Sequence, residues 1–271
     1  MASATQRDPA ERRLFIQRLT DIVGPKHVIT DEVGTRRYRN GFRFGGGPVV
    51  AVVRPGSLVE QWRVLEACVE SDRIVIAQAA NTGLTGGSTP DGDDYDREIV
   101  IVNTLRLNRL QVIDEGRQVV CLPGATLDQL EKVLAPLGRE PHSVIGSSCL
   151  GASVFGGVCN NSGGSLVKRG PAYTELSIHA RLDADGRLRL VNHLGIELGR
   201  RGEAEDEEEN PESILARLER GDYTADDIAH PDAAASDPDY IDHVREIDAE
   251  TRRASMPTLA DCLMRPVPPA S

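Results

Sequence analysis

Two glycine-rich stretches contain the residue types of this sequence that could do chemistry. The first, Ala79–Pro90, combines glycines with Asn, Thr and Ser and follows an apolar run that predicts a buried strand. Glycines let the backbone approach a ligand closely, and consecutive inward-facing amides form a concave anion site. This mixture suits a diphosphate, whose oxygens accept hydrogen bonds, although a plain surface loop could have the same composition.

The second stretch, residues 146–170, is rich in Gly, Ser, Cys and Asn. Its small residues would let the backbone pack against something bulky and flat, and the alternative is a tightly packed core segment. Two such stretches in adjacent lobes predict one extended ligand shared in the cleft between them.

Several other kinds of site are excluded by their missing signatures. No GxGxxG joins a first strand to a helix, no Gly-Lys-Ser/Thr forms a P-loop, and no CxxC or HExxH suggests a metal site. The formal net charge of -11 comes without a basic stripe, so no nucleic-acid partner is expected. No apolar run is long enough for a transmembrane segment, and the first residues lack a signal core, so we expect a cytoplasmic protein with free thiols.

The elements that must position the first stretch form a βαβ unit. Residues 49–54 and 74–78 are apolar runs typical of buried strands. Between them Ser57 and Glu60 fit a capping box that begins a helix. A strand is expected at 99–102 and an N-terminal helix at 14–22, whereas 31–47 is read as irregular and basic.

A second unit precedes the second stretch. A strand at 118–122 leads to a turn and to a helix that Thr126 and Gln129 begin with another capping box. Alternating apolar residues from Leu176 to Leu190 predict a hairpin around an Asp-Ala-Asp-Gly turn. A short helix is expected at 211–218.

The two stretches resemble the FAD-binding lobes of the vanillyl-alcohol oxidase type, or PCMH type, of flavoprotein. That resemblance implies an α+β fold, a two-lobed PCMH-type FAD-binding domain. The sequence more closely resembles the respiratory, quinone-dependent D-lactate dehydrogenase family, over roughly residues 13–251. The similar segments are GFR at 41–43, AANTGLT at 79–85, GSTP at 87–90, LGREPHSVIGSSC at 137–149, NNSGGSLV at 160–167, RGPAYTE at 169–175 and VNHLGI at 191–196.

The resemblance implies noncovalent FAD, because some relatives attach FAD through a His in the first stretch and no His occurs there. It also implies oxidation of D-lactate to pyruvate with electrons passed to quinone. The second stretch would contact FAD at Gly146, Ser153 and Gly163. The first would hold the diphosphate and ribose through Ala79, Ala80, Asn81, Thr82, Gly83, Gly87 and Ser88.

No catalytic acid or base is assigned. His142, His193, Cys149 and Cys159 could be polar contacts or structural residues, and the sequence leaves the oligomeric state open. Two alternatives remain, namely a noncatalytic FAD-binding fragment and an FAD oxidase of another 2-hydroxy acid.

The C-terminal end departs from the family. Relatives are about twice as long, continue into a cap and a basic membrane-contacting segment, and lie peripherally on the cytoplasmic face of the inner membrane. We expect a domain incomplete at the C-terminus, with weak FAD affinity and little turnover alone. The expected parts are a helix and lead-in (1–47), a first FAD-binding lobe (48–115), a second lobe (116–251) and an out-of-frame tail (252–271).

Overall fold

The computed structural model describes residues 8–116, 118–141, 147–160, 162, 177–194 and 210–224. Its principal sheet has the strand order β1-β2-β4-β3, in which β2, β4 and β3 are parallel and β1 is antiparallel to β2. These strands are β1 (Val28–Ile29), β2 (Ala51–Val53), β3 (Ile74–Gln78) and β4 (Ile99–Asn103). The strands expected at 49–54, 74–78 and 99–102 are therefore confirmed, with the first of them shorter.

Helices cover both faces of this sheet. On one face α1 (Pro9–Val23) and α3 (Leu58–Glu70) pack through buried residues that include Phe15, Leu19 and Val64. On the other face Tyr38 of α2 (Glu32–Arg39) packs with Val52 and Ile101. Because both faces are covered, β2 and β4 are apolar without alternation.

Helix α2 contradicts the expectation that residues 31–47 are irregular. Asp31 caps the helix by accepting a hydrogen bond from the Gly34 amide, at 2.7 Å. Only Thr35 and Tyr38 are buried, and three arginines occupy the last turn. The apolar face of this helix is therefore too narrow for the helix to be predicted from the spacing of apolar residues.

Two antiparallel hairpins follow the sheet, and the second was predicted. They are formed by β5 (Leu110–Ile113) with β6 (Gln118–Cys121) and by β7 (Ser177–Leu182) with β8 (Leu188–His193). The other helices are α4 (Leu127–Leu134), α5 (Val154–Cys159) and α6 (Pro211–Arg220). Single 3₁₀ turns are η1 (Pro25–His27), η2 (Asp114–Gly116), η3 (Ala135–Leu137) and η4 (Ser148–Leu150).

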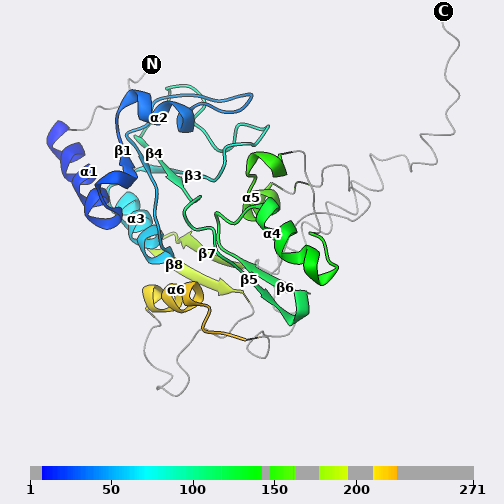
Figure 1. Ribbon diagram of the computed structural model, residues 1–271. Coiled ribbons are helices and arrows are strands. Elements are labelled where there is room, and N and C mark those ends of the chain that lie inside the picture. Colours follow the sequence, from blue (N-terminus) through cyan, green and yellow to red (C-terminus); the bar gives the residue numbers. More distant parts are fainter. Residues whose placement is uncertain are drawn as a thin grey trace, which may run out of the picture.

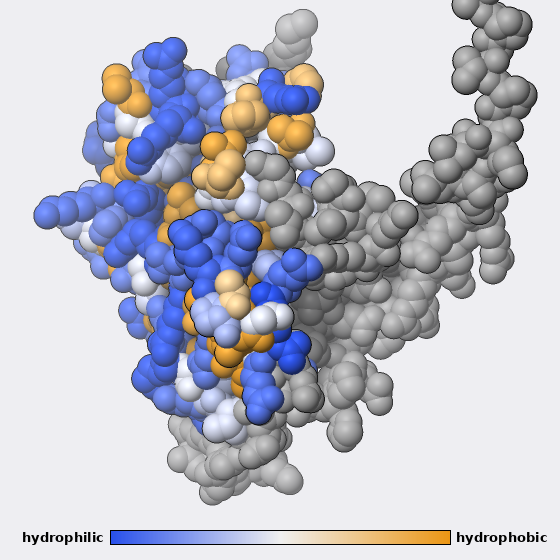
Figure 2. Space-filling view, turned by 45° about the vertical axis from the view of Figure 1, so that its right-hand side comes forward, coloured by the Kyte–Doolittle hydropathy of each residue, from blue (hydrophilic) through white to orange (hydrophobic). Residues whose placement is uncertain are grey.

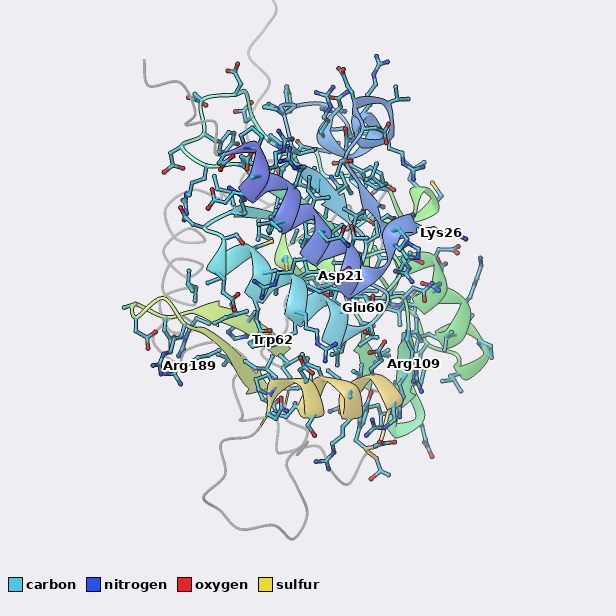
Figure 3. The ribbon with its side chains drawn as sticks, turned by 90° about the vertical axis from the view of Figure 1, so that its left-hand side faces the viewer. Asp21, Lys26, Glu60, Trp62, Arg109 and Arg189 are labelled. Atoms are coloured by element: carbon cyan, nitrogen blue, oxygen red, sulfur yellow. The ribbon has the colours of Figure 1, made fainter. Side chains whose placement is uncertain are left out.

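Helix α6 lies beside α3, although about 150 residues separate them in the chain (Figure 1). Arg63 Nε and Nη2 each donate to Glu212 at 2.7 Å, and the Leu58 amide donates to Glu219 Oε2 at 3.0 Å. Seen from the side, α1, α3 and α6 follow one another across one face of the molecule (Figure 3). The expected boundary between lobes, at 115/116, falls in η2 between β5 and β6.

Candidate ligand-binding site

The first glycine-rich stretch leaves the carboxyl end of β3, where buried amide side chains hold its base. Gln78 is 2% exposed, and its Nε2 donates to the Tyr38 and Ser88 carbonyls at 2.7 and 2.8 Å. Asn103, at the end of the neighbouring β4, donates to the Ala79 carbonyl at 2.8 Å. Ligands of open α/β sheets bind outside the carboxyl ends of the strands, so this is the expected edge for a site.

Asn81 forms hydrogen bonds that connect the first glycine-rich stretch with Asn40 and with its own later residue Ser88. Its φ is +55°, an orientation that Asn tolerates better than most residues. Its Nδ2 donates to the Asn40 carbonyl at 2.8 Å, and its Oδ1 accepts from Ser88 Oγ at 2.8 Å. Asn81 and Ser88, which are both predicted to contact FAD, therefore also stabilise the shape of the loop.

Gly46 and Gly47, which precede β2, contact the far end of this loop. The Gly46 amide donates to the Pro90 carbonyl at 2.6 Å, and the Gly92 amide donates to the Gly46 carbonyl at 2.9 Å. A Cβ on Gly47 would lie 2.1 Å from the Gly92 carbonyl oxygen, so this backbone approach requires glycine. The loop is thus held at both ends and along one side.

The middle of the loop leaves its amides available. In the part of the chain that the structure describes, none of the backbone N–H groups from residue 80 to residue 88 donates a hydrogen bond. Gly83 and Gly87 are exposed, and a Cβ on either would meet nothing closer than 3.9 Å. A run of unpaired amides beside open space fits the oxygens of a diphosphate.

The second stretch is anchored beside the same sheet edge. The Leu127 amide donates to the Ala152 carbonyl, and the Val154 amide donates to the Ala125 carbonyl, both at 2.9 Å. Gly124 packs against Thr104, the residue that follows β4. An added Cβ on Gly124 would lie 2.1 Å from the Thr104 carbonyl oxygen. These contacts place η4 and α5 next to the loop that follows β3.

The two stretches meet at Ala80 and Gly151. A Cβ built on Gly151 would lie 3.9 Å from the Ala80 Cβ, which is ordinary van der Waals contact. Ser153 is 4% exposed and caps α5 by accepting from the Gly156 amide at 3.0 Å. Of the predicted residues, Ala80 and Ser153 therefore lie near this contact, whereas Gly146 and Gly163 lie outside the described residues, as do His142 and the His193 side chain.

Two of the positioning residues, Gln78 and Asn103, were not among the predicted site residues. Each is the polar last residue of an apolar strand, in the sequences IVIAQ and IVIVN. An amide residue at the end of two apolar strands was the signal that could have identified Gln78 and Asn103. A buried amide must be hydrogen-bonded, so its side chain is expected to hold a neighbouring segment.

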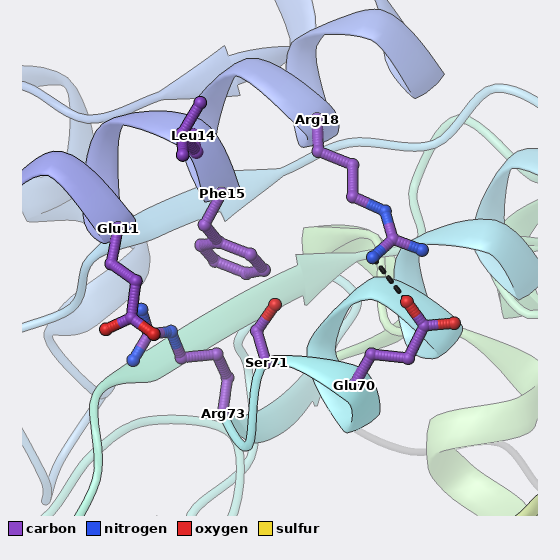
Figure 4. A pocket seen from close by; sticks show the side chains of 7 residues that line it. All are labelled: Glu11, Leu14, Phe15, Arg18, Glu70, Ser71 and Arg73. Carbon is purple, nitrogen blue, oxygen red and sulfur yellow. Dashed lines mark hydrogen bonds and ion pairs between the residues drawn. The ribbon is translucent and has the colours of Figure 1, made fainter.

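A cavity of about 280 Å³ lies elsewhere, between α1 and the end of α3 (Figure 4). Arg73 is buried there over the Phe15 ring, with its guanidinium carbon 5.0 Å from the ring centroid, while Arg18 pairs with Glu70 across the opening. None of the residues that line it belongs to a glycine-rich stretch. Within the described ranges, no group of three or more His, Cys, Asp or Glu could hold a metal ion, and no helix has the length and hydropathy of a membrane span.

Comparison with known proteins identifies relatives of most of the chain. Quinone-dependent D-lactate dehydrogenase of Escherichia coli (strain K12) is 57% identical over 251 residues, which are 93% of this chain and 42% of that protein. The enzyme of the same name from Haemophilus influenzae is 56% identical, over 86% of this chain and 40% of its own length. The chain thus spans about two fifths of the length of these relatives.

Solved structures share the fold at low sequence identity. Alkyldihydroxyacetonephosphate synthase matches with a TM-score of 0.55 and 15% identity over 79% of this chain and 38% of its own. p-Cresol methylhydroxylase matches with a TM-score of 0.53 and 14% identity, over 70% of this chain and 37% of its own. The predicted PCMH-type α+β fold is therefore confirmed.

The FAD binding domain family matches residues 49–190, just over half of the chain. This range begins just before β2, contains both the loop after β3 and α5, and ends within β8. The predicted cofactor, FAD, is confirmed by that match. Because this family model matches more than half of the chain and spans both glycine-rich stretches, this chain belongs to the FAD binding domain family.

Proposed function

We propose that the chain is the FAD-holding part of an enzyme that oxidises D-lactate to pyruvate and passes the electrons to quinone. Support comes from the 56–57% identity to two enzymes whose names state that activity. A D-2-hydroxyglutarate dehydrogenase of Arabidopsis thaliana is only 30% identical over 70% of the chain, so D-lactate is the favoured 2-hydroxy acid.

The unpaired amides of residues 80–88 are the observation that carries the FAD-holding role in this proposal. They would donate to the FAD diphosphate, and the open Cα positions of Gly83 and Gly87 would let it approach. Asn81 and Ser88 would hold the loop in the binding shape, while Ser153 and the proposed contacts Gly146 and Gly163 would bound the other side. When bound, FAD supplies the redox chemistry by accepting two electrons from the hydroxy acid.

The proposed attachment of FAD is noncovalent. The loop from Ala79 to Gly92 contains no His that could bond to the flavin. In the described residues Cys149 is exposed but lies in η4, outside that loop. FAD would therefore be released unchanged when the protein is denatured with acid, and the released flavin would account for all of the bound absorbance.

Within the whole enzyme, this part would bind and orient FAD, and no proton transfer is assigned to its residues. Oxidation of D-lactate releases two electrons and two protons, and reduction of quinone to quinol consumes both. We propose that such an enzyme works peripherally at the cytoplasmic face of the membrane, where quinone is available. The 271-residue chain alone would bind FAD weakly and turn over little D-lactate.

An exchange of segments tests the proposed activity. The 251-residue segment of the Escherichia coli enzyme that aligns with this chain would be replaced by the corresponding segment of this chain. The expected result is an FAD-bearing hybrid that reduces quinone with D-lactate. A folded, FAD-bearing hybrid that oxidises another 2-hydroxy acid but not D-lactate would refute the substrate while leaving the cofactor assignment intact.

A further inference from the structure

A group of basic residues surrounds the carboxyl end of β2. Lys26 and His27 belong to η1, Arg54 directly follows β2, and Arg106 follows β4. The Arg54 amide donates to the His27 carbonyl at 2.9 Å, which ties η1 to the end of the strand. Together with Glu60 of α3, these residues are called the β2-edge cluster.

Arg106 is the central residue of the β2-edge cluster. Its Nη1 donates to the Arg54 carbonyl at 2.6 Å and lies 4.0 Å from Glu60 Oε2. Its guanidinium covers Gly56, where an added Cβ would lie 2.4 Å from Nη2. The Arg106 side chain is 30% exposed, so it is held firmly but remains accessible to a solute.

The cluster has more positive charge than its own carboxylate can balance. Lys26 and Arg54 form no ion pair within the described ranges, and Glu60 also accepts from the Gly56 amide at 2.6 Å. The formal net charge of the whole chain is -11, so this local excess of positive charge is opposite in sign to the chain as a whole. Such a local field attracts anions.

Two buried polar atoms of the cluster lack partners in the described structure. They are Arg54 Nε and His27 Nδ1. A desolvated donor without an acceptor is costly, and charge-assisted hydrogen bonds from arginine are among the stronger ones. Burial is the first cause that lowers the pKa of His27, followed by the charges of Arg106 and Arg54.

The amino-terminal end of α3 lies beside the cluster, and two carboxylates, Glu60 and Glu219, already accept from its Gly56 and Leu58 amides. This helix has 13 residues, and Ser57 caps it by accepting from the Glu60 amide at 3.1 Å. These carboxylates offset the dipole at this helix end, so Arg54 and Arg106 are the groups that could bind a ligand directly.

We propose that the β2-edge cluster binds a phosphate-type oxyanion through Arg54 and Arg106. Arginine binds phosphate in a bidentate manner, and Lys26 would contribute charge from the exposed side. The glycine loop follows β3, and β4 lies between β3 and β2 in the sheet. The proposed site is thus two strands away from the start of the diphosphate loop. Its ligand is either free phosphate or a phosphate group of a larger molecule.

Titration of the 271-residue protein with inorganic phosphate tests the proposal. The apparent melting temperature would be followed at constant ionic strength, with chloride as the reference anion. Wild-type protein is expected to show a saturable increase, and Arg106→Gln is expected to weaken phosphate binding at least tenfold. The matched control is Arg97→Gln, which removes the same charge from a surface arginine paired with Asp96 and Asp72 and should bind like wild type.

Lys26→Gln is a second variant that keeps the proposal testable if Arg106→Gln fails to fold. Lys26 is exposed and unpaired in the described structure, so Lys26→Gln should fold normally and weaken phosphate binding several-fold. Absence of a saturable phosphate effect in wild type, or an equal effect in wild type, Arg106→Gln and Lys26→Gln, would overturn the proposal.

Repeating the titration with saturating FAD identifies the source of the oxyanion. If phosphate still binds, the cluster takes a ligand separate from FAD. If FAD abolishes phosphate binding and Arg106→Gln also weakens FAD binding, the cluster binds a phosphate of FAD itself. Either result supports an oxyanion site, and neither depends on turnover of D-lactate.

Discussion

At the scale of single residues, four amide and hydroxyl side chains determine the shape of the candidate site. Gln78 and Asn103 hold the beginning of the loop, and Asn81 bonds with Ser88 across it. Because these side chains pair with one another or with carbonyl groups, the loop amides remain available to a ligand. The sequence predicted the loop and its chemistry, but it could not predict which side chains would be used internally.

Replacement of Asn81 by Ala should weaken both the fold and FAD binding. The change removes the hydrogen bonds to Asn40 and Ser88. It also places alanine at a φ of +55°, a conformation that alanine tolerates less well than asparagine. The expected loss is about 1–3 kcal/mol of unfolding free energy, measured by urea denaturation. Asn81→Gly relieves the backbone and should recover part of the stability but not the FAD affinity. Equal FAD affinity in all three proteins would contradict this role.

The buried thiol of Cys68 and the partly buried thiol of Cys121 should be unreactive in the folded protein. Burial raises the pKa of Cys68 to about 12 and that of Cys121 to about 11, from the usual 9.0. The unfolded chain therefore loses these protons at lower pH than the folded chain, so their contribution to stability is complete below pH 9 and declines above it. Peptide-resolved alkylation at pH 8 should modify both cysteines only after unfolding. Native alkylation of Cys68 at the unfolded rate would disprove its burial.

At the scale of elements, local signals predicted some helices and missed others. Thr126 begins α4 with the expected capping box, and Ser57 caps α3 as expected, although Glu60 accepts from the Gly56 amide instead of closing a box with the Ser57 amide. Both caps could be predicted because a cap is encoded within a few residues. Strand β5 and helix α2 were missed because tertiary packing stabilises short segments that have weak patterns. The docking of α6 on α3 also depends on contacts between distant residues, which no local pattern contains.

The turn before α4 should tolerate no side chain at Gly124. A Cβ there would lie 2.1 Å from the Thr104 carbonyl oxygen, so Gly124→Ala must separate the second stretch from the sheet edge. We expect a loss of about 2 kcal/mol or more in unfolding free energy. The control is Gly157→Ala in α5, where the added Cβ meets nothing within 4 Å and stability should be unchanged or slightly higher. Equal stabilities of the two variants would contradict the described packing.

At the scale of the whole molecule, apolar side chains remain exposed around the two stretches. Phe44 is 65% exposed and Leu150 57%, and apolar patches interrupt the hydrophilic surface on the face shown in Figure 2. The chain spans about two fifths of the length of its relatives. In the proposed full-length enzyme, further chain would cover such surface, so we expect the 271-residue protein alone to be poorly soluble.

The proposed out-of-frame tail lies outside the described residues and stays a prediction. If residues 252–271 are read in a shifted frame, the nucleotide sequence after the Thr251 codon should encode a family-like continuation. Resequencing of this locus is the direct measurement. An in-frame stop codon after Ser271, with no family-like sequence in any downstream frame, would refute the prediction.

The central claim is that the loop amides of residues 80–88 bind the diphosphate of FAD. Gly87→Val places a branched side chain in open space at the loop, where it should block FAD without disturbing the fold. The matched control, Ala184→Val, introduces the same valine side chain at the exposed β7–β8 turn. The direct test is titration of the three 271-residue proteins with FAD, followed by flavin fluorescence. The account predicts saturable binding to wild type and Ala184→Val and at least a tenfold weaker affinity for Gly87→Val with an unchanged melting temperature. Equal FAD affinity in all three folded proteins would contradict it.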